Sequence, residues 1–107
     1  MVIEKTIGVP APRVVPSPAR DAMNETADRL VLEVVSAVDD GYTGVPECQR
    51  LIAWLGAEFL PYATARYPDP PADLAELTAV LDEMHGSNGE IAAQLSLQAR
   101  SLVFRLL

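Results

Sequence analysis

The chain has 107 residues, half of them hydrophobic and only six of them aromatic, and it carries a net charge of -7 at neutral pH. This length suits one domain with one core, and the scarcity of aromatic side chains favours packed α-helices built from Leu, Val, Ile and Ala. The negative charge argues against nucleic acids and anionic membrane surfaces as partners, because both repel an acidic protein without a basic patch.

No apolar run in the sequence reaches the roughly 20 residues that span a bilayer. The first residues also lack the apolar core of a secretory signal. The single cysteine, Cys48, has no partner for an internal disulfide, which agrees with a reducing compartment. We therefore expect a soluble protein of the cytoplasm.

Residues 1–17 contain Pro10, Pro12 and Pro16 among small and β-branched residues, which predicts an extended or disordered arm rather than a helix. Two interpretations stay open. The segment is either a tail without fixed contacts or an arm that lies along a neighbouring subunit and buries its valine and isoleucine side chains there. The folded domain is predicted to span residues 18–107.

The first helix is predicted over residues 18–39. Ser17 can cap the free amides at the helix start, and Pro18 suits the first turn. Apolar residues then recur at helical spacing until Asp39-Asp40-Gly41 ends the run; they are Met23, Ala27, Leu30, Val34 and Val38.

The second helix is predicted from Pro46 to about Tyr67, before a run of prolines. Proline and Glu47 suit its first turn, because the helix dipole favours a negative charge there. Pro61 lies inside the helix and predicts a kink, since it removes one backbone hydrogen bond and collides with the preceding turn. The inner stripe consists of Cys48, Leu51, Ile52, Leu55, Phe59 and Tyr62.

The third helix is predicted to begin at Asp73 and to continue to the last residues. Its residues at alternating steps of three and four form one stripe, which we call the seam: Leu74, Leu77, Leu81, Met84, Asn88, Ile91, Leu95, Gln98 and Leu102. Gly86 and Gly89 weaken the middle of this helix, each by up to about 1 kcal/mol relative to alanine. A break between them would give four helical pieces instead of three.

His85 is the only histidine, so motifs that need two imidazoles from one chain are excluded. It lies one step from the seam, with Asp82 three residues before it on the same helix face. The simpler interpretation is an exposed histidine beside an acid. The alternative is a metal site in which a two-fold dimer supplies two Asp82-x-x-His85 pairs, with Glu58 as a further carboxylate.

Asn88 is a polar residue in the middle of the seam, at a position where the pattern would place a large apolar side chain. A buried amide without partners costs about 1 to 3 kcal/mol, so its presence needs a reason. One reason is that a polar core residue fixes register and oligomeric state. The other is descent from a protein whose interior was polar because it held a metal.

No catalytic constellation or phosphate-binding loop is present, and no cofactor is expected. Cys48 has no histidine at a recognisable spacing and is expected to pack as a small hydrophobic residue.

Two stretches, LIAWLGAEFLPYATARYPD at residues 51–69 and LDEMHGSNGEIAAQL at residues 81–95, resemble the middle of a bacterial hemerythrin-like (HHE cation-binding) domain. That family often shows a helix that reads approximately L-x-P-H-A-x-x-E-E-x-x-L-Y-P, and then one that reads E-H-x-x-I. The resemblance implies that Tyr62 and Asn88 stand where two iron-binding histidines would stand, and that Arg66 replaces an acidic ligand. It implies a bundle that has lost its di-iron site, with Tyr62 and Asn88 as interior polar positions.

The sequence as a whole predicts an all-α fold, an antiparallel bundle of three helices, or of four if the third one breaks. An apolar cluster of Val103, Phe104, Leu106 and Leu107 is expected to meet a second copy or a partner protein. The expected function is a non-enzymatic interaction or accessory role, most simply as a homodimer. The alternative is a small metal-binding or ligand-binding bundle whose site is assembled at a dimer interface from Glu58, Asp82 and His85.

Overall fold

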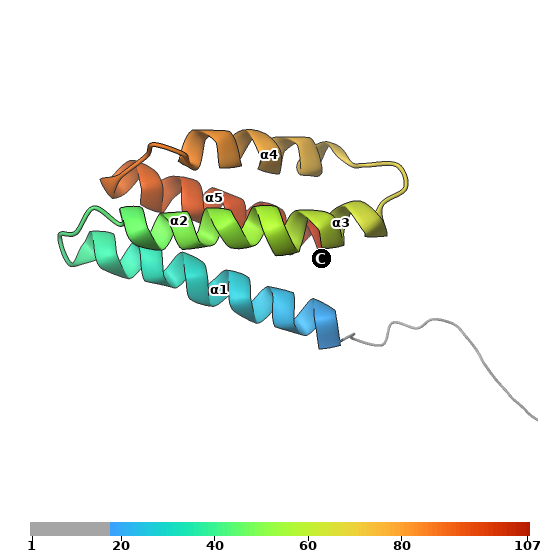
Figure 1. Ribbon diagram of the computed structural model, residues 1–107, viewed down its shortest axis with the longest axis horizontal. Helices are drawn as coiled ribbons and strands as arrows, with labels where there is room; N and C mark the ends of the chain where they lie inside the picture. The colour runs from blue at the N-terminus through green and yellow to red at the C-terminus, as the bar shows by residue number, and fades with distance from the viewer. Residues whose placement is uncertain (1–17) are drawn as a thin grey trace, which may run out of the picture.

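The computed structural model describes residues 18–107, and these residues form helices without any strand. The elements are α1 (Pro18–Asp39), α2 (Val45–Trp54), the π-helical turn η1 (Leu55–Phe59), α3 (Leu60–Arg66), α4 (Ala72–Met84) and α5 (Gly89–Leu106). Since α2, η1 and α3 follow one another directly, they make one long helix, and the described residues form four helices in all (Figure 1). This confirms the all-α prediction. The expected arm at residues 1–17 lies outside the described residues.

The first helix has the predicted bounds. It begins at Pro18, ends at Asp39, and is followed by a turn in which the amide of Tyr42 donates to the carbonyl of Ala37 at 2.9 Å. Gly44 then has a left-handed backbone with φ of 73°, and a β-carbon there would lie only 2.9 Å from Val38 Cγ2. Glycine is therefore required where the chain turns closely past α1 to begin α2.

A π-helical turn directly precedes Pro61, the residue at which the sequence predicts a kink. Proline cannot donate a backbone hydrogen bond, and its ring collides with the carbonyl four residues earlier. The chain avoids this by widening one turn, in which the amide of Leu60 donates to the carbonyl of Leu55, five residues back. The helix continues through α3 to Arg66, one residue before the predicted end.

The predicted continuous third helix is wrong, and the four-piece alternative holds. Gly86 has φ of 82° and Gly89 has φ of 60°, so the backbone leaves the helical region between Met84 and Gly89. The chain reverses there, which brings α5 alongside α4 (Figure 1). The amide of Gly89 donates to the carbonyl of Thr43 at 2.7 Å and ties this turn to the turn between α1 and α2.

The break changes which residues of α5 face the core. The seam is correct through α4, where Leu74, Leu77, Leu81 and Met84 are buried, but beyond the break only Leu95 and Leu102 of its members are buried. A new helix begins with its own rotational phase, so its buried stripe cannot be extrapolated across the turn. That stripe consists of Ala92, Ala93, Leu95, Ser96, Ala99, Leu102, Val103 and Leu106.

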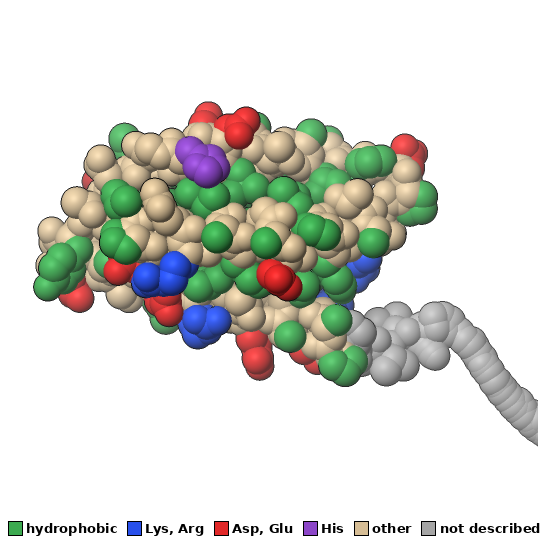
Figure 2. Space-filling model, in the orientation of Figure 1, with side chains coloured by type: hydrophobic (Ala, Val, Ile, Leu, Met, Phe, Trp, Pro, Cys, Tyr) green, Lys and Arg blue, Asp and Glu red, His purple; other side chains and the backbone are tan. Residues whose placement is uncertain are grey.

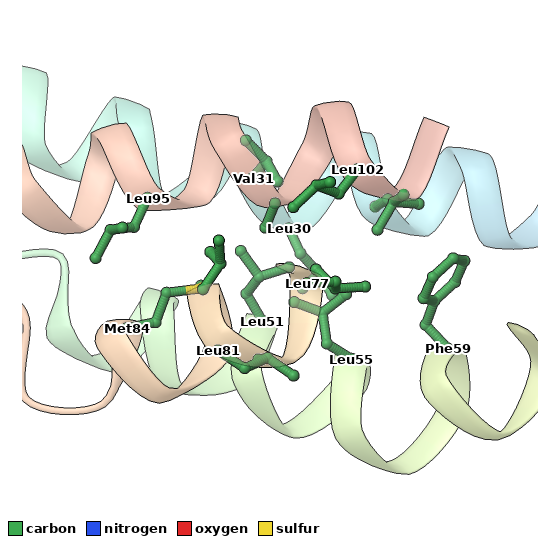
Figure 3. Packing of buried hydrophobic residues seen from close by; sticks show 14 of the residues in the cluster. Leu30, Val31, Leu51, Leu55, Phe59, Leu77, Leu81, Met84, Leu95 and Leu102 are labelled. Atoms are coloured by element: carbon green, nitrogen blue, oxygen red, sulfur yellow. The ribbon is translucent and has the colours of Figure 1, made fainter. Parts of the chain in front are cut away.

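One hydrophobic core joins the four helices. Figure 3 shows Leu51, Leu55 and Phe59 of the long second helix pointing toward side chains of α4, α5 and α1. Burial of each such side chain contributes about 1.5 to 3 kcal/mol relative to full exposure. At one end of the molecule the hydroxyl of Tyr67 donates to the carbonyl of Leu106 at 2.9 Å, and Nε of Arg20 donates to the carbonyl of Leu107 at 3.0 Å.

Candidate functional site

Tyr62, one of the two expected interior polar residues, is half-buried on α3. Its ring lies 6.3 Å from the ring of Phe59, centroid to centroid, and packs against the edge of the core. Its hydroxyl accepts a hydrogen bond of 3.1 Å from Nη1 of Arg66, which is exposed. This bond raises the pKa of the Arg66 guanidinium. The polar end of Tyr62 is thus held at the surface by a cation.

Asn88, the other expected interior residue, is exposed, so its placement in the core is corrected. It precedes α5 as the N-cap residue with an extended backbone, and its side chain makes no capping hydrogen bond. The reversal after Met84 carries Asn88 away from the core position that a continuous helix would give it. Tyr62 and Asn88 therefore do not form a polar interior pair.

The interior of the described residues holds two other chemically distinctive side chains. Ser96 is the only buried polar residue of residues 18–107, and its hydroxyl donates to the carbonyl of Ala92 at 2.7 Å. Cys48 is also buried; the loss of solvent raises the pKa of its thiol, and hydrogen bonding with Ser87 and Ser96 partly offsets this. A protonated buried thiol is a poor nucleophile. Cys48 thus packs in the core, as its sequence position predicted.

The sequence does not predict that Ser96 is buried, because the seam of a continuous third helix contains the neighbouring Leu95 and does not contain Ser96. The signal that would find it is the recurrence of small residues at 92, 96 and 99, counted from a helix start at Gly89.

The three residues of the alternative metal site, Glu58, Asp82 and His85, are all exposed. Within residues 18–107, no group of three or more His, Cys, Asp or Glu side chains comes together in a way that could hold a metal ion. His85 follows the end of α4, on the wall of a cavity of about 290 Å³ that it shares with Gln49, Ile52 and Ala53 of α2. A site completed by a second copy stays a prediction.

The four residues of the expected apolar interface cluster differ in their exposure to solvent. Val103 and Leu106 are each only 1% exposed because they pack in the core of the chain itself, so they are corrected from interface to core residues. Leu107 is partly buried against the same core. Phe104 is 67% exposed. Of the four residues, Phe104 alone presents a large apolar surface.

Phe104 belongs to a face formed by the outer sides of α1 and α5, which we call the α1–α5 outer face. Leu97, one heptad earlier on α5, and Leu32 on α1 are also exposed, at 52% and 64%. Arg100 of α5 contacts Asp28 of α1 and donates to Oδ1 of Asn24 at 2.8 Å.

These contacts place the three apolar side chains of the α1–α5 outer face along the junction of the two helices. The Arg100 guanidinium lies 5.7 Å from the centre of the Phe104 ring. Leu97 precedes Arg100 by three residues, and Leu32 follows Asp28 by four, so both lie about one turn from this ion pair. Phe104 also lines a cavity of about 420 Å³ with Arg20, Asn24 and Leu107. The face therefore combines exposed apolar groups with a paired charge.

Comparisons with known proteins give no further guide to this site. No protein-family model matches the chain. No curated protein and no solved structure matches it either. Within residues 18–107, no helix is long and apolar enough to cross a membrane.

Proposed function

We propose that this protein is a non-enzymatic interaction protein of the cytoplasm: an antiparallel four-helix bundle that forms a homodimer through its α1–α5 outer face. The observation that carries the proposal is the exposure of Leu32, Leu97 and Phe104 on that face. Single exposed apolar residues are ordinary, but several on one face are typical of an interaction surface.

The composition of the core supports a role without chemistry at an interior site. A catalytic pocket needs titratable groups held near one another in a cleft. In residues 18–107 the buried side chains are apolar except for Ser96, whose hydroxyl is engaged by its own helix. The exterior is therefore the better candidate for the functional part of the molecule.

We also propose that the bundle descends from a hemerythrin-like domain in which apolar side chains have replaced the metal site. Four helices and a core of leucines and Phe59 are compatible with that origin. The motif resemblance at residues 51–69, where Tyr62 packs against the core, is its main support.

The proposal is tested by sedimentation velocity over a range of protein concentrations. We expect the wild-type chain to sediment as a dimer and the Leu97→Glu and Phe104→Glu variants to sediment as monomers, because a carboxylate buried in an apolar interface is strongly unfavourable. Tyr42→Glu is the matched control. Tyr42 is 71% exposed but lies in the turn between α1 and α2, so this variant should remain dimeric. Circular dichroism checks that each variant keeps its helices.

Two results would contradict the proposal. A wild-type chain that stays monomeric at high concentration would exclude the dimer. Dissociation of the Tyr42→Glu variant to the same extent as Phe104→Glu would show that added charge, and not loss of the α1–α5 outer face, separates the subunits.

A further inference from the structure

A second surface, separate from the α1–α5 outer face, lies between α4 and the long helix made of α2, η1 and α3; we call it the α2–α4 groove. One end is the cavity of about 290 Å³ lined by Ile52, Ala53 and His85. The other end is a cavity of about 470 Å³ whose lining, between Leu60 and Thr78, contains no charged side chain. Figure 2 shows hydrophobic side chains along this junction, with the purple histidine at its rim.

The groove is open because α4 packs mainly on α5 and makes only a few contacts with α2. Its walls carry small side chains, among them Ala53 on α2 and Ala75 on α4, both exposed. Small residues allow another helix to approach closely, at an axis separation of about 8 to 10 Å. Nothing in residues 18–107 fills this space.

Gly56 is the most informative residue of this region. It lies inside the long helix, where glycine costs about 0.5 to 1 kcal/mol relative to alanine. A β-carbon at this position would meet no atom within 4 Å, and the backbone does not have a positive φ. Helical phase places Gly56 on the same side of the helix as Ile52 and Leu60, which line the two cavities. Packing within the described chain does not require this glycine, whereas close approach of an external helix would.

The charge around the groove indicates what such a helix would carry. The segment from Val45 to His85, which forms both walls, contains seven carboxylates and two arginines. Glu47 pairs with Arg50, and Asp73 pairs with Arg105 of α5, which leaves five carboxylates of this segment without an ion pair to the described residues. Asp82 is exposed on α4 one turn before His85 and lies at the rim by helical phase. The lining is mainly apolar, and the remaining carboxylates make the surroundings negative. A negative surface attracts a basic partner and repels a second copy of this acidic chain.

We propose that the α2–α4 groove binds an amphipathic helix of a partner protein that is apolar on one face and rich in Lys or Arg on its flanks. The walls run from Gln49 to Thr64 and from Pro71 to His85, which corresponds to about 22 Å of helix at 1.5 Å per residue. A helix of about 15 residues fills that length. The apolar face enters the groove, and the basic flanks face the carboxylates.

The experiment measures binding of a defined probe to the full chain by calorimetry and by amide chemical shifts. The probe is a synthetic peptide of about 15 residues with leucine along one helical face, lysine on both flanks and blocked termini. One control peptide has the same composition in an order that scatters the leucines around the helix. A second control replaces every lysine by glutamate. We expect the first peptide alone to bind, with shifts confined to α2, η1, α3 and α4.

Two variants fill the groove from opposite walls, Gly56→Leu and Ala75→Leu. Each is expected to weaken binding of the lysine peptide by about tenfold or more, because the added side chain occupies the space of the peptide. Ala65→Leu, on exposed α3 outside the cavity linings, adds the same side chain to the same long helix and should bind the peptide as wild type does. Melting curves establish that all three variants are folded.

Charge is tested separately with Asp82→Lys and, as its control, Glu25→Lys on the exposed side of α1. Both variants change the net charge equally. Only Asp82→Lys should lower the affinity for the lysine peptide, by about two- to fivefold at low salt and by less at high salt.

The proposal is overturned if the lysine peptide fails to bind at millimolar concentration, if the glutamate peptide binds as well, or if both groove-filling variants bind like wild type. Shifts centred on Phe104 would instead assign the peptide to the α1–α5 outer face. Because Leu97→Glu and Phe104→Glu leave the groove intact, they should bind the lysine peptide normally, so failure of the dimer and failure of the groove are distinguishable.

Discussion

Phe59 shows how much of the fold depends on a single side chain. It is fully buried in the π-helical turn, with its ring 5.9 Å from that of Trp54 and 6.3 Å from that of Tyr62, centroid to centroid. Both neighbouring rings are only partly buried, so Phe59 is the one fully buried aromatic side chain of residues 18–107.

We expect Phe59→Ala to lower the free energy of unfolding by about 3 to 5 kcal/mol, because it removes a large buried ring and leaves a cavity. A domain of this size is stable by only about 5 to 15 kcal/mol, so the variant should be close to unfolding at room temperature. Phe59→Leu, the control, should lose far less. Urea denaturation followed by Trp54 fluorescence measures both. A loss below about 1 kcal/mol for Phe59→Ala would contradict the core assignment.

Cys48 gives the stability of the protein a pH dependence. Burial raises the pKa of its thiol in the folded state, so the folded protein holds this proton more tightly than the unfolded chain does. The resulting stabilisation is fully present below the thiol pKa of the unfolded chain. It is lost as the pH rises through the higher pKa of the folded state. We expect the wild type to lose stability faster than Cys48→Ala as the pH rises above the ordinary thiol pKa of about 8.5. Parallel pH profiles from urea denaturation would contradict this.

At the scale of elements, two glycines have different roles. Gly86 lies where the predicted third helix is interrupted, and Gly56 lies on an exposed side of the long second helix. Gly86 has a backbone conformation that L-residues rarely adopt and follows the end of α4. Gly56 lies in the π-helical turn η1 without a positive φ, and there is free space where its side chain would be. The two positions therefore predict opposite effects of the same substitution.

We expect Gly86→Ala to destabilise the protein by about 1 kcal/mol, because a left-handed backbone is unfavourable for alanine. Gly56→Ala should instead stabilise it by about 0.5 to 1 kcal/mol, since alanine favours the helix and meets no neighbour. Each 1 kcal/mol corresponds to a change of about 4 to 8 °C in Tm for a domain of this size, which calorimetry resolves. A Gly86→Ala variant as stable as wild type would argue for a continuous helix across residues 84–89.

At the scale of the whole molecule, the two proposed surfaces differ in their electrostatics. The α1–α5 outer face is apolar with its central arginine already paired to Asp28. The α2–α4 groove has a mainly apolar lining, and the segment that forms its walls carries an excess of carboxylates over arginines. The net charge of -7 opposes contact between two copies and favours contact with a basic partner.

Salt should therefore act on the two interactions in opposite directions. Raising the ionic strength from about 0.05 to 0.5 M shortens the range of charge repulsion to a few ångströms, so the dimer should become tighter. The same change should weaken binding of the lysine peptide, because screening reduces its attraction to the carboxylates around the groove. Sedimentation and calorimetry in the same buffers measure both. A dimer that dissociates as salt increases would show that ion pairs, not the apolar face, hold it together.

The sequence by itself determined the helical class, the bounds of α1, the buried half of the seam on α4 and the burial of Cys48, because proline, capping residues and apolar periodicity act locally. Only the tertiary structure decided that the chain reverses after Met84, since the two glycines permit either a weakened helix or a turn, and contact with α5 selects the turn. That reversal placed Asn88 at the surface, moved Val103 and Leu106 into the core and left Phe104 exposed. Rotational phase is lost at a helix break, so the choice between core and interface on α5 could not be read from spacing alone.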